Sequence, residues 1–91
     1  MAKICVVDER HADIKVFRAD RESRADLLVY VVDRESQAKS DALWYMEDRE
    51  NRATATIAWV DNERKADLSV FFVDRESRAR WNKPHNLQNQ M

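Results

Sequence analysis

Pairs of acidic residues two positions apart recur along the chain, and paired carboxylates are the groups from which calcium sites and glycosidase active sites are built. Asp20 with Glu22 is one such pair. A calcium loop uses about six to eight oxygen ligands and usually a glycine for its sharp turn. The chain has no glycine, and Arg21 and Arg24 would oppose the cation. We therefore interpret the pairs as solvated turn residues that form ion pairs, and we predict neither a metal nor a cofactor.

The serines and histidines lack the spacing that nucleophilic catalysis or a zinc site would need. A catalytic serine is a single residue beside a base, whereas Ser23, Ser36 and Ser77 are three copies of one repeat position. Neither His11 nor His85 has a cysteine or another histidine at a metal-ligand spacing. The lack of glycine also excludes the P-loop and the dinucleotide-binding loop. We predict that the protein is not an enzyme.

Tryptophans and arginines are the residues with which a protein would hold bases, sugars or phosphates. Trp44, Trp59 and Trp81 fall on the inward face of the expected strands, where core filling is favoured over a stacking platform. Arginines that recur at the repeat spacing could line up along a phosphate backbone. A glutamate stands near each of these arginines in sequence and cancels most of the positive potential that would attract phosphates.

These residues belong to an internal repeat in which a charged hexamer, such as residues 20–25, leads into an apolar run. Alanine closes each copy, and the intervals between successive alanines are 13, 13, 15, 13 and 13 residues. A fixed period of this kind indicates one structural unit per copy. The closing alanines are Ala12, Ala25, Ala38, Ala53, Ala66 and Ala79.

The apolar runs alternate with a period of two and are rich in β-branched and aromatic residues, which is typical of strands. The fourth copy carries two extra residues near Ser40, and an insertion of two keeps every side chain on its own face. Between the strands we expect glycine-free, four-residue loops of right-handed helical conformation, in which the leading aspartate accepts backbone N–H bonds. The predicted strands are 3–7, 12–19, 25–32, 41–47, 53–60, 66–73 and 79–82.

The short connections suggest how the strands are joined. A parallel crossover usually needs a dozen or more residues by itself, so we predict hairpins and an all-β antiparallel meander of six to seven strands. One face of this sheet is almost wholly apolar and must be hidden, either by rolling into a small barrel or by pairing with a second sheet. A stacked β-solenoid is a third, less favoured solution.

Composition limits the class of protein. The 91 residues form one small domain, predicted as residues 1–83 with a polar tail at 84–91, and the net charge of −1 gives no general reason to expect nucleic acid or membrane partners. Cys5 is the only cysteine, so a reducing compartment fits, and the register places it on the outer face as a small hydrophobic residue. We find no signal peptide or membrane span in the sequence, and we expect a cytoplasmic protein.

The repeat resembles that of a family of small, uncharacterised bacterial proteins built from tandem Val-Asp-x-x-Ser-x-Ala-Asp-Leu-x-Val-Tyr units. The matching residues include Val32-Asp33 with Ser36 and Ala38, residues 66–71, and the closing Ala79-Arg80-Trp81. The resemblance covers roughly residues 3–83 and implies no activity. The chain departs from the family in having arginine after the turn aspartate, where an aromatic residue is expected.

A repeat without a catalytic constellation favours a non-catalytic protein-interaction or self-assembly module, whose partner is another protein or a second copy of the chain. The alternative is a small β-barrel that binds nucleic acid. For the interaction module we expect the contact surface to combine outward aromatic residues with charged loops, whereas the nucleic-acid binder would use the turn arginines together with Trp81. The other residues predicted for these surfaces are Phe17, Tyr30, Tyr45, Phe71, Arg24, Arg34, Arg52 and Arg78.

Overall fold

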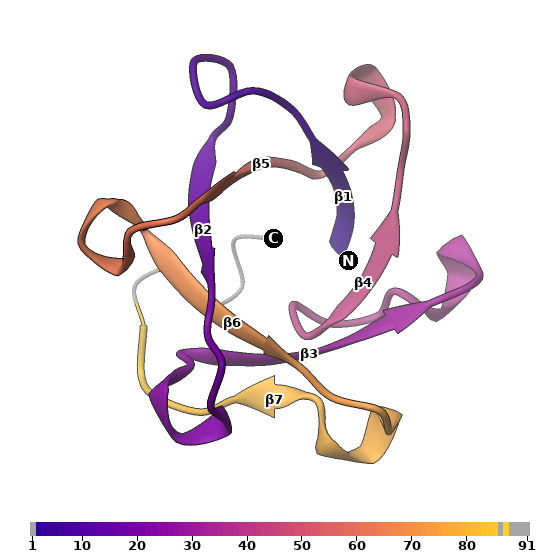
Figure 1. Ribbon diagram of the computed structural model, residues 1–91. Coiled ribbons are helices and arrows are strands. Elements are labelled where there is room, and N and C mark those ends of the chain that lie inside the picture. The colour runs from indigo at the N-terminus through magenta and orange to yellow at the C-terminus, as the bar shows by residue number, and fades with distance from the viewer. Residues whose placement is uncertain (1, 86, 88–91) are drawn as a thin grey trace.

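The computed structural model describes residues 2–85 and 87, and these form a ring of short strands whose connections project outward around the perimeter (Figure 1). Each strand coincides with one of the predicted apolar runs. Alternation of apolar residues therefore located the strands correctly. The strands are β1 Ala2–Val6, β2 Ile14–Arg18, β3 Leu27–Val32, β4 Leu43–Met46, β5 Ala55–Val60, β6 Leu68–Phe72 and β7 Arg80–Trp81.

The sheet is a closed barrel of six parallel strands, and the predicted antiparallel meander is wrong. The strand order is β4-β1-β5-β2-β6-β3, and the pairing of β3 with β4 closes the ring. Every pairing within this ring is parallel. The antiparallel strand is β7, which lies outside the ring of six strands and pairs with Leu27 and Leu28 at the start of β3. The apolar face is therefore enclosed by barrel closure, but through crossovers and not through hairpins.

The error came from the length assumed for a crossover. The usual minimum of a dozen or more residues applies to crossovers that contain a helix and span the length of a long strand. Here the strands are four to six residues long, which is about 13–20 Å. The link between β1 and β2, residues 7–13, can reach about 25 Å when extended. A seven-residue link is therefore long enough to bring the chain back to the start of the next parallel strand.

The chain passes around the barrel in two interleaved laps. The first lap contains β1, β2 and β3, and each step between them skips one position of the ring. The step from β3 to β4 moves to the adjacent position instead, and the second lap of β4, β5 and β6 therefore fills the gaps left by the first. The two extra residues of the fourth repeat lie at this step.

Five of the six charged hexamers form single 3-10 turns, in agreement with the expected right-handed helical loops, and the first copy, at residues 8–13, forms a hydrogen-bonded turn instead. In the first of the five 3-10 turns, the Arg24 N–H donates to the Arg21 carbonyl and the Ala25 N–H to the Glu22 carbonyl. The residues that flank all five turns have negative φ, so none of these positions requires glycine. The turns are η1 Glu22–Arg24, η2 Glu35–Gln37, η3 Glu50–Arg52, η4 Glu63–Lys65 and η5 Glu76–Arg78.

The barrel interior is filled by layers of one side chain from each strand. Because burying a large aliphatic side chain contributes about 1.5–3 kcal/mol, these layers supply most of the stability of so small a chain. The layer nearest the amino ends of the strands consists of Ala2, Ile14, Leu27, Ala42, Ala55 and Leu68, all buried. The central layer consists of Ile4, Val16, Val29, Trp44, Ile57 and Val70, all with 0% exposure.

Side chains at the starts of several strands join the two laps. The Asp67 Oδ2 accepts the Lys15 N–H at 3.0 Å, and the Asp26 Oδ2 accepts the Ser69 N–H at 3.2 Å. Thr54 Oγ1 accepts the Lys3 N–H in the same way. Each bond links residues more than forty positions apart, so these side chains fix the register between laps.

Candidate functional site at the barrel mouth

A third layer of inward positions lies at the carboxyl ends of the strands, two residues beyond the central layer. Because the six strands are parallel, these positions gather at one end of the barrel, which we call the mouth. Four of its large apolar side chains are exposed: Val6 by 46%, Val31 by 41%, Met46 by 40% and Trp59 by 40%. The mouth layer consists of Val6, Arg18, Val31, Met46, Trp59 and Phe72.

The opposite end of the barrel is covered by the last described residues. Trp81 and Leu87 pack against the buried core, and the Trp81 indole N–H donates to Asp41 Oδ2 at 3.1 Å. His85 stacks on Trp81 with ring centroids 5.5 Å apart and planes inclined by 20°. Small side chains at Ala2, Ala42 and Ala55 stand in the layer at this end. The two ends therefore differ, with one covered by the chain and the other exposing apolar side chains.

Aromatic rings meet at one side of the mouth. The ring centroids of Trp59 and Phe72 lie 5.9 Å apart with the planes inclined by 55°, and Phe72 also meets the buried Trp44 edge-on at 6.1 Å. The Cζ atom of Arg18 lies 5.1 Å from the centroid of the Phe72 ring, which is a cation–π contact. A cavity of about 670 Å³ opens here, lined by Phe17, Arg18, Trp59, Val60, Asp61 and Phe72.

Carboxylates follow the mouth layer on every strand. Two residues after each mouth position the chain has an aspartate, and all six of these aspartates are exposed. Asp61 also lines the aromatic cavity. We call this set the aspartate rim: Asp8, Asp20, Asp33, Asp48, Asp61 and Asp74.

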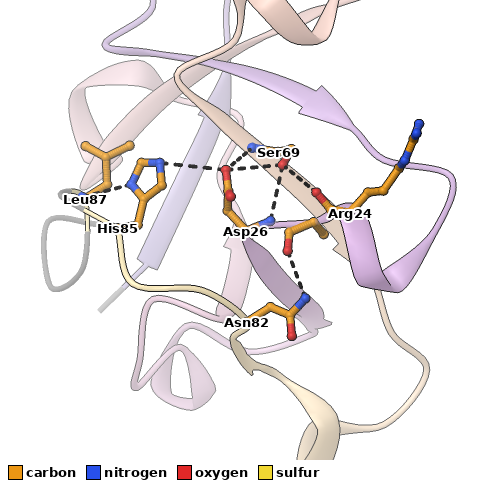
Figure 2. Close-up of polar contacts among 7 residues, drawn as sticks. Arg24, Asp26, Ser69, Asn82, His85 and Leu87 are labelled. Carbon is orange, nitrogen blue, oxygen red and sulfur yellow. Dashed lines mark hydrogen bonds and ion pairs between the residues drawn. The ribbon is translucent and has the colours of Figure 1, made fainter.

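A serine, an aspartate and a histidine meet at the covered end of the barrel, but not in the arrangement of a catalytic triad (Figure 2). The Ser69 hydroxyl donates to Asp26 Oδ2 at 3.2 Å, and His85 Nε2 lies 3.8 Å from the same oxygen. A nucleophile must contact its base, whereas here both groups converge on the carboxylate. The Asn82 side-chain amide also donates to the Ala25 carbonyl at 3.0 Å. This cluster holds the end of the chain against the barrel.

The outward aromatic residues named from the sequence lie on four consecutive strands of the ring and are all half-buried. Tyr30 and Phe71 pack against a small outer cluster formed by Ala19, Ala25, Leu28 and Val73. Phe17 is the one that also lines the aromatic cavity. The full set is Phe17 on β2, Tyr30 on β3, Tyr45 on β4 and Phe71 on β6.

The four arginines named from the sequence are exposed and come from four different connections. Arg78 forms an ion pair with Glu22 of η1. Arg24 borders a hollow that also contains Glu63 and Lys83. Two of the four arginines thus lie near carboxylates, and Arg34 and Arg52 stand on the separate η2 and η3 connections.

Sequence reasoning placed the tryptophans on the correct face but missed the exposure of one of them. Trp44 fills the core as predicted, and its indole N–H donates to the Asp41 carbonyl at 2.7 Å. The core assignment is wrong for Trp59, because it is the last inward residue of β5 and faces the mouth. Its position two residues before a turn aspartate is the signal that could have identified it.

Cys5 is buried, with 5% exposure. Burial raises the pKa of its thiol, and the nearby charge of Glu50 acts in the same direction. The thiolate is the nucleophilic form of cysteine, so this environment disfavours a reactive role.

Neither a metal-binding cluster nor a membrane-spanning helix is found among the described residues. No group of three or more histidine, cysteine, aspartate or glutamate side chains in that part of the chain could hold a metal ion. None of the helices formed by those residues is long and apolar enough to cross a bilayer.

The chain was compared with known proteins. No curated protein and no solved structure matches it. A family model described as the 7(1) septoil knot domain matches residues 1–82, which is consistent with the small, repeat-built family expected from the sequence, while the particular repeat motif stays a prediction. The interleaved laps of parallel strands fit a description as a knot. The chain belongs to the septoil knot domain family.

Proposed function

We propose that the protein is a non-catalytic interaction module that binds another protein, or a second copy of itself, through the barrel mouth. One observation carries this proposal: Val6, Val31, Met46 and Trp59 are 40–46% exposed together at one end of the barrel, although each occupies an inward-facing position. Large apolar side chains that share one exposed surface mark sites of association.

The residue types of the mouth support a protein partner. Tryptophan, phenylalanine, methionine and arginine are enriched at the centres of protein interfaces, and tryptophan and arginine dominate their binding energy. All four types occur in the mouth layer, at Trp59, Phe72, Met46 and Arg18. A rim of charged residues around an apolar centre is also the usual organisation of an interface.

The same arrangement opposes the alternative of a nucleic-acid binder. Nucleic-acid affinity depends largely on cations that neutralise phosphates, whereas the mouth is followed on every strand by an aspartate. The alternative keeps a definite test, because it predicts binding to a single-stranded oligonucleotide that weakens steeply as salt is added.

The proposal is tested by measuring association in solution. The mass of the purified chain is followed by light scattering over about a hundredfold dilution, because self-association obeys mass action. Partner proteins are captured from extract of the source cells in parallel. The double variant Trp59→Ser with Met46→Ser should lower the self-association or abolish the capture.

The matched control is Tyr45→Ser with Tyr30→Ser, which removes two large side chains from the outer face of the barrel. This control should retain the mass and the captured partners of the unmodified chain. If the mouth variant behaves like the unmodified chain in both measurements while remaining folded, the mouth is not the contact surface and the proposal fails.

A further inference from the structure

The chemistry of the partner can be inferred from Arg18, and this inference rests on the function proposed above. Arg18 is the single polar residue of the mouth layer. Its guanidinium lies over the face of Phe72, with Cζ 5.1 Å from the ring centroid. The mouth therefore already accommodates a cation against an aromatic ring. The other five residues of the mouth layer are apolar.

The aspartate rim explains why a cation is accommodated there. Among the described residues, Asp8 is the rim aspartate that forms an ion pair, and its partner is His11. The five others are exposed and form no ion pair within that part of the chain. Carboxylates gathered around an apolar site create a negative potential, which attracts a cation and focuses its approach.

Four of the six rim aspartates are each followed directly by an arginine, but Asp61, which lines the aromatic cavity, is not. Arg21, Arg34, Arg49 and Arg75 each come directly after a rim aspartate and have extended backbone dihedral angles. Successive side chains of an extended backbone point to opposite sides. These arginines therefore project away from the aspartates before them, which stand at bends where the chain leaves the strands, whereas Asp61 is followed by the uncharged Asn62.

Trp59 offers a second aromatic face for a cation. Trp59 is 40% exposed, its ring is inclined by 55° to that of Phe72, and both residues line the cavity of about 670 Å³ together with Asp61. An ammonium or guanidinium group binds best over tryptophan among the aromatic residues, and more strongly where it is shielded from water. Phe17 and Val60 supply apolar walls for the rest of a long side chain.

We propose that the mouth binds a segment of a partner protein that carries an arginine or lysine between apolar residues. The basic head of that residue lies against Trp59 beside Asp61, and its apolar neighbours cover Val6, Val31 and Met46. The aspartate rim disfavours an acidic segment or a nucleic-acid strand at this site.

The experiment uses the full chain and three short peptides with blocked ends. The probe is Leu-Arg-Leu, the neutral control replaces its arginine by citrulline, which has nearly the same shape without the charge, and the acidic control is Leu-Glu-Leu. Binding is followed by the NMR signals of the three indole N–H groups. Trp44 and Trp81 serve as internal references, because their N–H groups are hydrogen-bonded to Asp41.

We expect the arginine peptide to move the Trp59 signal and to bind about tenfold more tightly than the citrulline peptide, with an affinity that falls as salt is added. Asp61→Asn should remove most of this difference. Glu63→Gln is the matched control, because it removes one exposed carboxylate from η4, two residues farther along the chain, and it should leave the difference intact.

The results separate the inference from the proposed function. If the citrulline or glutamate peptide binds as tightly as the arginine peptide, the mouth docks apolar side chains without regard to charge, and the inference fails while the proposed function stands. If no peptide moves the Trp59 signal but the double mouth variant still loses its partner, the inference again fails alone. If neither the peptides nor that variant has any effect, both fail.

Discussion

The indole ring of Trp59 and the phenyl ring of Phe72 meet at 5.9 Å although they come from β5 and β6, which do not pair with each other. β2 lies between these strands and contributes Arg18, whose guanidinium covers Phe72. The contact therefore spans an intervening strand at the mouth, where side chains converge across the barrel. Phe72 also meets the buried Trp44 edge-on, and the first prediction compares Trp44 with Trp59.

Replacing Trp44 or Trp59 by phenylalanine should have very different effects on stability. Trp44→Phe leaves a cavity in the fully buried layer and removes the donor to the Asp41 carbonyl, so we expect a loss of about 2–3 kcal/mol in the free energy of unfolding. Trp59→Phe changes a 40% exposed side chain and should cost less than about 1 kcal/mol. Denaturant unfolding measures both, and equal losses would show that the mouth is covered in solution.

Asp26 should contribute to stability more than a rim aspartate does. Asp26→Ala removes the acceptor for both the backbone N–H and the hydroxyl of Ser69, so we expect a loss of about 1–3 kcal/mol in the free energy of unfolding. Asp20→Ala is the matched control at an exposed position and should change it by less than about 0.5 kcal/mol. The same denaturant titration compares the two variants, and similar losses would argue against Asp26 as a link between the laps.

The pKa of His11 should lie above the ordinary histidine value of 6.5. Its cause is the hydrogen bond from the imidazole to Asp8, reinforced by the aspartate charge. A raised folded-state pKa gives stability that is fully present below the unfolded value and is lost as pH rises through the folded value. NMR titration of the imidazole proton should show the raised pKa, and Asp8→Asn should bring it back toward 6.5. A titration that Asp8→Asn leaves unchanged would contradict this assignment.

The Cys5 thiol should react slowly in the folded protein. Burial raises its pKa, and Glu50 adds to the effect, so the thiolate is scarce at neutral pH and the sulfur is covered. Reaction with a coloured disulfide reagent should be at least about tenfold slower than in denaturant. Rapid modification of the folded chain would mean that β1 opens easily, and hydrogen exchange at Ile4 and Val6 would then be fast as well.

The strand positions could be predicted because alternation and the closing alanines are local signals. The direction of pairing could not be predicted, because the alternation of inward residues such as Ile14 and Val16 is the same whether the neighbouring strand is parallel or antiparallel. Connection length was the remaining guide, and it misled because strands as short as Leu43–Met46 need no long return. The sequence does not reveal that Asp26 and Asp67 join the laps, because their partners Ser69 and Lys15 lie far away in sequence.

The mouth was only partly predictable for a different reason. Alternation assigns Trp59 and Met46 to the inward face, but whether an inward residue is buried depends on what covers the end of the barrel. The described chain covers the other end with Trp81 and Leu87, and the polar segment that follows Trp81 shows no periodicity from which this cover could be predicted. The aspartates of the rim were visible as repeat positions, whereas their gathering at one end required the parallel order.

The interleaving of the laps has a consequence for biosynthesis. Every strand pairing in the sheet joins one of β1, β2 and β3 to one of β4, β5, β6 and β7. The amino-terminal half of a nascent chain therefore has no native strand partner while it leaves the ribosome, and the barrel can begin to form only as the second half emerges. Its first three strands have unpaired edges until β4 is available, and β2 has none of its native strand partners before β5.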